Sequence, residues 1–134
     1  MRILAGHALL PEGWRESVAV TIADGRIDAI ELSASSLPGD MRMPALLPAL
    51  SNLHSHTFQR GMAGMSEVRG AASDSFWTWR EVMYKFVDHL TPDDIEAIAA
   101  MAFVEMQEGG FAAVAEFHYV HHQHGGGTYA DIAE

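Results

Sequence analysis

The sequence contains no cysteine among its 134 residues. Disulfide bonds are therefore excluded, and any bound metal must be held by His, Asp or Glu side chains. Long hydrophobic runs are absent too, since no stretch approaches the roughly 20 apolar residues that span a bilayer. The first residues also lack the apolar core of a signal peptide. We therefore expect a cytoplasmic protein without a membrane partner.

Basic residues are few, because 8 Lys and Arg stand against 18 Asp and Glu, for a formal net charge of −10. A charge of this sign disfavours nucleic acids and anionic membranes as partners. It does not exclude a small substrate, because a pocket can be locally basic inside an acidic protein. The share of hydrophobic residues, 49%, is typical of a soluble globular protein.

The first 32 residues have the pattern of short β-strands. Val18, Val20 and Ile22 alternate with other residues, and Asp24-Gly25 is typical of the tight turn of a β-hairpin. A polar linker with proline and glycine follows at 33–40. A two- or three-stranded piece of this kind is marginal alone and needs a partner surface.

From residue 45 onward, strand-like and helical patterns alternate. An apolar segment with prolines leads into a buried strand that ends in NLHSH, and a glycine-rich stretch that we expect to be a long loop comes next. Residues 73–90 have helical spacing, with Ser73 or Asp74 as the cap. Thr91-Pro92 begins a second helix, and Gly109-Gly110 ends it before the second buried strand, FAAVAEFHYV.

This order predicts a βαβ unit, which implies an α/β fold with a parallel sheet and a right-handed crossover. Two parallel strands do not make a stable sheet. We therefore expect residues 45–134 to form the first βα units of an incomplete (β/α)₈ TIM-type barrel. Residues 1–44 would form the N-terminal part of a small β-sandwich domain. The abrupt end after the glycine run at 125–127 also suggests a fragment.

The motif NLHSH places His54 and His56 two residues apart at the end of a predicted strand. Residues i and i+2 of a strand face the same way, and the C-terminal ends of barrel strands carry the active sites of that fold. Two imidazoles about 6–7 Å apart along a strand can converge on one zinc-sized cation. H-x-H also occurs by chance, above all in a chain with eight histidines, so two hydrogen-bonded or solvated turn histidines are the alternative.

The surroundings of this motif resemble the amidohydrolase superfamily of metal-dependent hydrolases, whose first barrel strand ends in H-x-H. Pro48 matches the family lead-in, whereas Ala49 and Asn52 stand where glycine and aspartate are common, which points to the deaminase-like branch. Within that branch NLHSHTFQRGMAG, DSFWTWREVMYKFVDHLTP and EMQEGGFAAVAEFHYVHH are similar to formimidoylglutamate deiminase. The resemblance implies hydrolysis of N-formimidoyl-L-glutamate to N-formyl-L-glutamate and ammonia, in histidine degradation, on one bound zinc ion.

The resemblance also implies that His54 and His56 are two of the zinc ligands. The other ligands, a histidine and an aspartate, and a histidine that helps to activate water would lie beyond residue 134, and the full-length protein would be a homodimer. By the same resemblance Gln59 hydrogen-bonds the substrate, which a neutral amide does as donor and acceptor together. From the residues alone, Gln59 is an ordinary loop glutamine.

Arg80 and Tyr119 are two further substrate-binding candidates, because the implied substrate carries two carboxylates. Arg80 would clamp a carboxylate bidentately, and the Tyr119 phenol would donate to a carboxylate oxygen. The alternatives are an arginine that covers apolar surface or pairs with Glu81 or Asp74, and a rim aromatic with its hydroxyl in water.

The histidines of the segment HYVHHQH look like a metal cluster, but we expect mostly solvated side chains there, since the family takes its ligands elsewhere; they are His118, His121, His122 and His124. Two other functions stay open. One is a related aminohydrolase of a purine, pterin or triazine ring, against which Arg80 and Tyr119 argue. The other is a non-catalytic fragment that binds metal weakly through its histidines.

Overall fold

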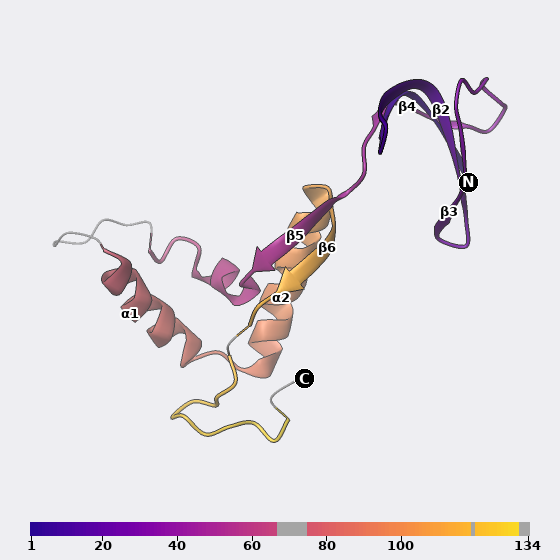
Figure 1. Ribbon diagram of the computed structural model, residues 1–134. Helices are drawn as coiled ribbons and strands as arrows, with labels where there is room; N and C mark the ends of the chain where they lie inside the picture. Colours follow the sequence, from indigo (N-terminus) through magenta and orange to yellow (C-terminus); the bar gives the residue numbers. More distant parts are fainter. Residues whose placement is uncertain (67–74, 119, 132–134) are drawn as a thin grey trace. The chain divides into compact units, whose positions relative to one another are not determined.

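The computed structural model describes residues 1–66, 75–118 and 120–131. The chain divides into two compact units, Met1–Ala49 and Leu50–Glu134. Within the described residues, no helix is long and apolar enough to cross a membrane. The elements of Figure 1 are, in order, β1 (Arg2–Leu10), β2 (Gly13–Ala23), β3 (Arg26–Glu31), β4 (Met41–Leu46), β5 (Leu50–Ser55), the 3₁₀ helix η1 (Thr57–Met62), α1 (Phe76–Val87), α2 (Pro92–Glu108) and β6 (Phe111–Glu116).

The first unit is a four-stranded sheet in the order β3-β2-β1-β4, with β4 parallel to β1 and the other pairs antiparallel. The predicted hairpin is confirmed. Asp24 and Gly25 have φ of 49° and 72°, and a two-residue turn with both φ values positive matches the twist of the flanking strands. Apolar side chains that are buried form the core of this unit, namely Ala5, Ala8, Val18 and Val20.

The segment predicted to be one extended run into a barrel strand is divided between two sheets. Residues 41–46 form β4 at the edge of the first sheet, and β5 begins at Leu50. Pro44 lies in this edge strand, which is the kind of strand in which a sheet tolerates proline. A Cβ on Gly6 would lie 3.0 Å from the Pro44 carbonyl oxygen, so glycine permits the close approach of β1 and β4.

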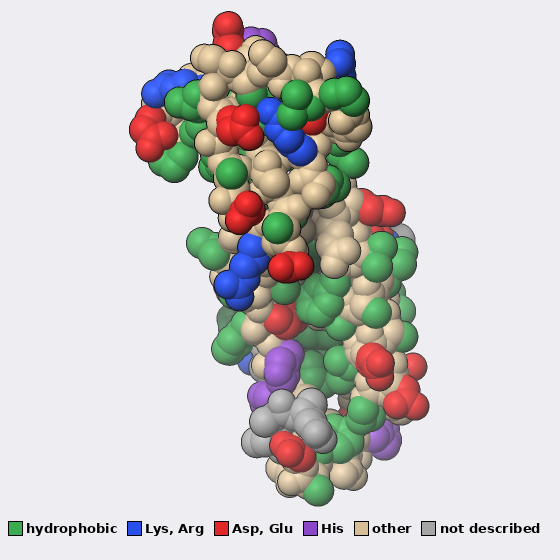
Figure 2. All heavy atoms as spheres, turned by 90° about the vertical axis from the view of Figure 1, so that its right-hand side faces the viewer, with side chains coloured by type: hydrophobic (Ala, Val, Ile, Leu, Met, Phe, Trp, Pro, Cys, Tyr) green, Lys and Arg blue, Asp and Glu red, His purple; other side chains and the backbone are tan. Residues whose placement is uncertain are grey.

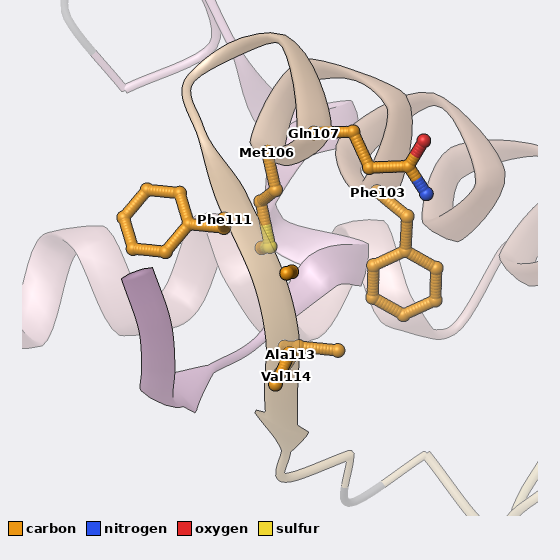
Figure 3. A pocket seen from close by; sticks show the side chains of 7 residues that line it. Phe103, Met106, Gln107, Phe111, Ala113 and Val114 are labelled. Carbon is orange, nitrogen blue, oxygen red and sulfur yellow. The ribbon is translucent and has the colours of Figure 1, made fainter. Parts of the chain in front are cut away.

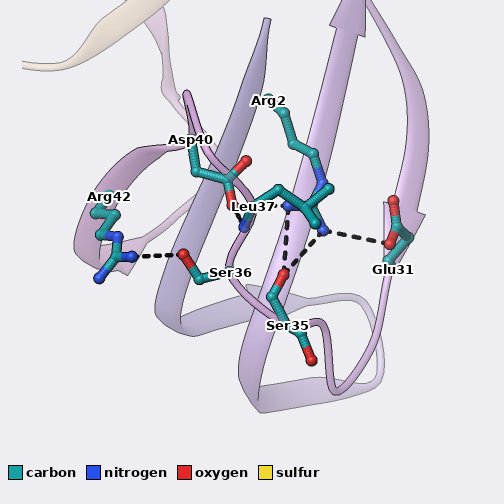
Figure 4. Close-up of polar contacts among 7 residues, drawn as sticks. All are labelled: Arg2, Glu31, Ser35, Ser36, Leu37, Asp40 and Arg42. Carbon is teal, nitrogen blue, oxygen red and sulfur yellow. Dashed lines mark hydrogen bonds and ion pairs between the residues drawn. The ribbon is translucent and has the colours of Figure 1, made fainter.

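Arg2 ties three segments of the first unit together (Figure 4). Its guanidinium donates to Asp40 Oδ2 at 2.7 Å, pairs with Glu31 at 3.3 Å and contacts the Ser35 carbonyl oxygen. The Leu37 N–H donates to the same Asp40 oxygen at 2.8 Å. The Leu37 N–H and then the Arg2 guanidinium hold the pKa of the Asp40 carboxyl below its ordinary value. The predicted linker is therefore fixed at its end by a nearly buried carboxylate.

In the second unit, β5 and β6 pair in parallel, with Leu50 opposite Phe111, which confirms the parallel βαβ pairing. α2 has the predicted Thr91 cap and ends at Glu108, with Gly109 as its C-cap. The predicted cap of α1 was Ser73 or Asp74, and the observed cap lies one residue beyond Asp74. Ser75 caps α1 by accepting from the Thr78 N–H, whereas residues 73 and 74 lie outside the described residues.

The stretch after NLHSH was predicted to be a long loop, and this is wrong for residues 57–62, which form η1. The apolar residues of this segment do not show the spacing that predicts a helix. Two of its side chains, Phe58 and Met62, pack with Met83 and Leu90 in the buried core of the second unit. Burial of these apolar side chains stabilises a short helix that the local sequence does not predict. Residues 67–74 of the expected loop lie outside the described residues.

The strands β5 and β6 were predicted to be buried, and this is wrong for the chain as described. Leu53 is 81% exposed and Phe117, just after β6, is 61% exposed. The physical reason is that two strands and the described helices offer too little surface to cover the pair. Figure 2 shows hydrophobic side chains at the surface of the second unit. In Figure 3, residues of α2 and β6 line an open, mostly apolar groove of about 490 Å³.

Candidate metal and substrate site

His54 and His56 meet where β5 ends and η1 begins. Their Nε2 atoms are 2.9 Å apart, and the rings stand edge to face with centroids separated by 4.6 Å. His54 is exposed and His56 is half-buried. The structure therefore brings together the two imidazoles that the H-x-H spacing singled out.

The convergence of the rings does not come from the simple alternation of a regular strand. β5 ends at Ser55, and its pairing with β6 is irregular between Asn52 and Ser55. Asn52 Oδ1 accepts from the His54 N–H at 3.1 Å. His56 already lies beyond the strand, as the cap residue of η1 with φ −131° and ψ 76°. The turn of the chain at the strand end thus directs the second ring toward the first.

The backbone of the segment after β6 fixes the ring of His56. Its Nδ1 lies 2.6 Å from the carbonyl oxygen of Phe117. A carbonyl only accepts hydrogen bonds, so Nδ1 carries the proton in this contact. In a neutral imidazole the other nitrogen, Nε2, is then the acceptor. It faces Nε2 of His54 at 2.9 Å, and it is the nitrogen through which a histidine held in this way ligates a metal.

Glu116, at the end of β6, is a site residue that the sequence reasoning missed. Its Oε1 accepts from the Thr57 N–H at 2.8 Å and from the Thr57 hydroxyl at 2.9 Å. Phe117 also donates its N–H to the Ser55 carbonyl oxygen at 2.9 Å. The end of β6 thus holds Ser55, His56 and Thr57. The available signal was one carboxylate in the otherwise apolar run FAAVAEF.

The histidine pair fits the chemistry of a zinc site. The chain has no cysteine, and neutral imidazole nitrogen is a common zinc ligand with a Zn–N distance of about 2.0–2.1 Å. Two such ligands in a tetrahedral site are roughly 3.3–3.4 Å apart, so the two Nε2 atoms need to separate by only a few tenths of an ångström. Among the described residues, no group of three or more His, Cys, Asp or Glu side chains could hold a metal ion. Within the described part of the chain, His54 and His56 would therefore be the two ligands at this place.

A pocket of about 380 Å³ lies beside the histidine pair and is lined by three of the residues that the resemblance selected, His56, Gln59 and Arg80. Gln59 belongs to η1 and Arg80 to α1, so the packing of these helices creates the pocket. The Gln59 amide donates to the sulfur of Met83 at 3.7 Å. The other lining residues are mostly aromatic, namely Phe76, Trp79, Met83 and Tyr84.

Arg80 is oriented by aromatic neighbours on its own helix. Its guanidinium donates to the Tyr84 hydroxyl at 3.0 Å, and its Cζ lies 5.1 Å from the Tyr84 ring centre and 5.8 Å from that of Trp77. Both distances are within cation–π range. Among the described residues no carboxylate pairs with Arg80, so a pairing with Glu81 does not occur. Asp74 and the substrate-binding candidate Tyr119 lie outside the described residues.

Arg60 joins η1 to α2 beside this pocket. Its Nε and a terminal nitrogen donate to the two carboxylate oxygens of Glu105, each at 2.7 Å. This bidentate hydrogen bonding holds the pKa of the Glu105 carboxyl below its ordinary value. Arg60 therefore has a structural role in joining η1 to α2, whereas Arg80 lines the pocket.

The C-terminal histidines make contacts with each other and with the end of α1. The rings of His118 and His121 are 5.1 Å apart. His124 places Nδ1 2.7 Å from the Asp88 carbonyl oxygen and 3.2 Å from the Asp88 carboxylate, at the end of α1. Our expectation that this segment holds no functional metal stays a prediction.

Comparison with known proteins gives the sequence context. Residues 1–43 match the family described as formimidoylglutamate deiminase HutF, N-terminal domain. The chain is 52% identical over 133 residues to formimidoylglutamate deiminase of Pseudomonas aeruginosa, which covers 98% of the chain and 29% of that protein. It is 29% identical over 125 residues to 5-methylthioadenosine/S-adenosylhomocysteine deaminase of Natronomonas pharaonis, covering 89% of the chain and 27% of that protein.

A solved structure agrees with these relatives. The crystal structure of an amidohydrolase from Brucella melitensis matches with a TM-score of 0.88 and 49% identity, over 96% of this chain and 29% of that one. The chain thus spans less than a third of the length of the relatives that it matches. The similarity to formimidoylglutamate deiminase that the three sequence motifs predicted is confirmed along nearly the whole chain, as similarity to the N-terminal part of such an amidohydrolase.

Proposed function

We propose that this chain is part of a zinc-dependent deiminase that hydrolyses N-formimidoyl-L-glutamate to N-formyl-L-glutamate and ammonia. One observation carries the proposal. His56, the Gln59 amide and the Arg80 guanidinium line one pocket of about 380 Å³, and Nε2 of His54 lies 2.9 Å from Nε2 of His56, in a chain 52% identical to a formimidoylglutamate deiminase. A volume of this size suits a small substrate.

The same proposal assigns the fold. β5 and β6 would be the first two strands of a (β/α)₈ barrel, in the region that we assign to residues 45–134, and residues 1–44 would belong to a small β-domain. The parallel pairing of β5 with β6 supports this assignment. So do the exposed apolar side chains of both strands, which further βα units would cover. The histidines stand at the C-terminal end of β5, where a barrel carries its active site.

His54 and His56 would hold the zinc ion through Nε2. A bound zinc ion lowers the pKa of a water molecule to about 7 and so supplies a nucleophile at neutral pH. The residues of this chain prepare that site. The Phe117 carbonyl oxygen keeps the proton of His56 on Nδ1, so Nε2 remains an acceptor for a cation. The remaining ligands and the group that protonates the leaving amine would come from elsewhere in a longer protein.

Arg80 and Gln59 would bind the two ends of the substrate. The Arg80 fork donates two parallel hydrogen bonds to a carboxylate, and Tyr84 and Trp77 hold it in place. The Gln59 amide offers both a donor and an acceptor to the polar formimidoyl group. Phe76 and Trp79 line the same pocket and give it aromatic walls. Tyr119 remains a proposed second contact for a carboxylate.

A ring aminohydrolase is the competing function, since the Natronomonas pharaonis relative is named a deaminase of a purine nucleoside derivative. A flat, neutral base needs aromatic stacking and amide contacts, and the pocket supplies aromatic walls. It does not need a guanidinium that no described carboxylate neutralises. Arg80 therefore favours an acidic, acyclic substrate. A non-catalytic role in weak metal binding is the third outcome of the test below.

Ammonia release from N-formimidoyl-L-glutamate and from adenosine derivatives, by the full-length protein that carries this segment, tests the proposal. We expect turnover of the first substrate alone. Arg80→Met should raise KM about 10- to 100-fold, because a charge-assisted hydrogen-bond pair is lost. Arg60→Met is the matched control, since Arg60 binds Glu105 and does not line the pocket. Turnover of adenosine derivatives alone, no turnover of either substrate, or equal KM changes in the two variants would contradict the proposal.

A further inference from the structure

We propose that Glu116 is a positioning residue, whose carboxylate sets the orientation of His56 by holding Thr57. This inference rests on the proposed function, because it assigns His56 to a metal site. Glu116 does not touch the proposed metal or substrate. It acts through the residue that directly follows His56 in the chain.

The contact between Glu116 and Thr57 is short, double and shielded from water. Oε1 accepts from the Thr57 N–H at 2.8 Å and from its hydroxyl at 2.9 Å. Thr57 is 5% exposed. Thr57 is the first residue of η1, and His56, its cap residue, makes no side-chain capping bond. Glu116 therefore supplies, from a strand 59 residues away, the acceptor that the start of this helix otherwise lacks.

The two residues at the end of β6 act on three consecutive residues at the end of β5. Glu116 holds Thr57, while Phe117 accepts from His56 Nδ1 at 2.6 Å and donates to the Ser55 carbonyl oxygen at 2.9 Å. Contacts from β6 and the residue after it therefore hold the backbone on both sides of His56, and this backbone sets the orientation of the His56 ring. Loss of the Glu116 carboxylate leaves a buried N–H and a buried hydroxyl without an acceptor. These unsatisfied groups favour a different backbone conformation at Thr57. A changed backbone at Thr57 would also strain the hydrogen bond from His56 Nδ1 to the Phe117 carbonyl oxygen.

The second oxygen of Glu116 makes the role of the side chain testable. Oε2 is buried and has no hydrogen-bond partner within the described part of the chain. One acceptor at the length of a glutamate side chain is therefore sufficient for the contact with Thr57. Glu116→Gln keeps this acceptor and loses the charge. Glu116→Asp keeps the charge, but it is one methylene too short to reach Thr57 from the same backbone position.

Nitrogen-15 NMR of the histidine side chains in the 134-residue chain reads the orientation of His56 without a metal. In the parent chain we expect His56 as a single tautomer with the proton on Nδ1. Glu116→Asp and Glu116→Ala should give a mixture of tautomers, whereas Glu116→Gln should retain the single one. Glu105→Ala is the matched control, because it removes the other carboxylate that holds η1, through Arg60. It should leave His56 unchanged.

Binding of Co²⁺, followed by its visible absorption, is the second readout. Glu116→Asp should bind Co²⁺ about 10- to 100-fold more weakly than the parent, the usual effect of losing an outer partner of a metal ligand. Glu116→Gln should stay close to the parent. If a Glu116 variant does not fold, Thr57→Val carries the test, since it removes only the hydroxyl bond and should give a partial loss of the single tautomer.

A single His56 tautomer in Glu116→Asp and Thr57→Val, or an equal change in Glu105→Ala, would overturn the inference. The proposed function fails in a different way. If the parent binds Co²⁺ no more tightly than His54→Ala while the Glu116 variants still alter the His56 tautomer, the metal site is refuted. The positioning contact would then stand.

Discussion

At the scale of single residues, a few hydrogen bonds set the orientation of the two histidines of the candidate metal site. The Nε2 atoms of His54 and His56 are 2.9 Å apart; the His54 N–H donates to the Asn52 side-chain amide oxygen, and His56 Nδ1 donates to the Phe117 carbonyl oxygen. The ring of His56 gains its direction from the Phe117 carbonyl oxygen. A site of this kind is sensitive to the helices that pack beneath it, and first of all to η1.

Gly61 lies where η1 packs closely against side chains of α1 and α2. A Cβ added there would lie 2.7 Å from Cζ of Phe86 and 2.8 Å from Cδ1 of Ile98. Gly61→Ala should therefore destabilise the second unit by about 1–3 kcal/mol through overpacking. Urea unfolding followed by circular dichroism measures the loss.

Gly127→Ala is the control for this substitution, because the nearest atom to its added Cβ is 3.9 Å away. It should change the unfolding free energy by less than about 0.5 kcal/mol. Equal stability of Gly61→Ala and the parent would mean that η1 can move away from α1 and α2 at little cost, and the pocket would then lack a fixed wall.

Part of the candidate site was predictable from the sequence. The H-x-H spacing identified the two histidines, and motif resemblance selected Gln59 and Arg80, which the structure places with His56 at one pocket. Glu116 was not predictable in the same way. Its hydrogen bonds to Thr57 join residues 59 apart in the chain, and no local pattern encodes a contact over that separation.

At the scale of elements, the sequence predicted those helix starts and turns that are stabilised by residues close together in the chain. The start of α2 was predicted from Thr91, Pro92 and Asp94, and the structure shows the complete capping box there. The turn at Asp24-Gly25 was predicted because these residue types readily adopt the positive φ values of a tight hairpin turn. η1 had no such signal, because the burial of Phe58 and Met62 against other helices stabilises it. The cap of α1 was predicted at Ser73 or Asp74, whereas Ser75 is the cap; adjacent polar residues of similar capping preference do not fix the helix start to one residue.

The first sheet should lose stability in acid through Asp40. Its pKa is lowered in the folded state by the Leu37 N–H and the Arg2 guanidinium, whereas an unfolded aspartate titrates near about 3.9. The stabilisation is therefore fully present above the unfolded pKa. It is lost as the pH falls through the folded pKa, because protonation removes the charge that both donors favour.

Hydrogen exchange of the β1 amides between pH 6 and pH 3 measures this loss, after correction for intrinsic exchange rates. Asp40→Asn should reduce the protection of β1 at pH 6 and flatten its dependence on pH. Glu16→Gln, on the exposed part of β2, is the control and should leave the profile as in the parent. A parent profile that does not fall toward acid would show that the charge of Asp40, which accepts from the Leu37 N–H and the Arg2 guanidinium, adds nothing to the stability of the sheet.

At the scale of the whole molecule, the second unit carries more apolar surface than it covers. Leu53 and Phe117 are 81% and 61% exposed near the ends of β5 and β6, and Met101 and Val104 of α2 are each 52% exposed. The two-stranded sheet also has two open edges. The proposed barrel explains these faces, because further strands and helices would cover them. The interpretation as a fragment predicted the parallel pair with unpaired strand edges and uncovered helix faces, but both strands were expected to be buried, and their exposure was not predicted because burial depends on neighbours outside the local pattern.

The isolated chain should therefore associate through its second unit. Open strand edges and uncovered apolar faces favour contacts between copies, so we expect concentration-dependent association by analytical ultracentrifugation and strong binding of a hydrophobic dye. Leu53→Thr should reduce both. Leu32→Thr removes a side chain that is 57% exposed in the first unit and should change neither. A monomeric sample with one sharp thermal transition would contradict the expectation, and with it the view that these faces need covering by further βα units.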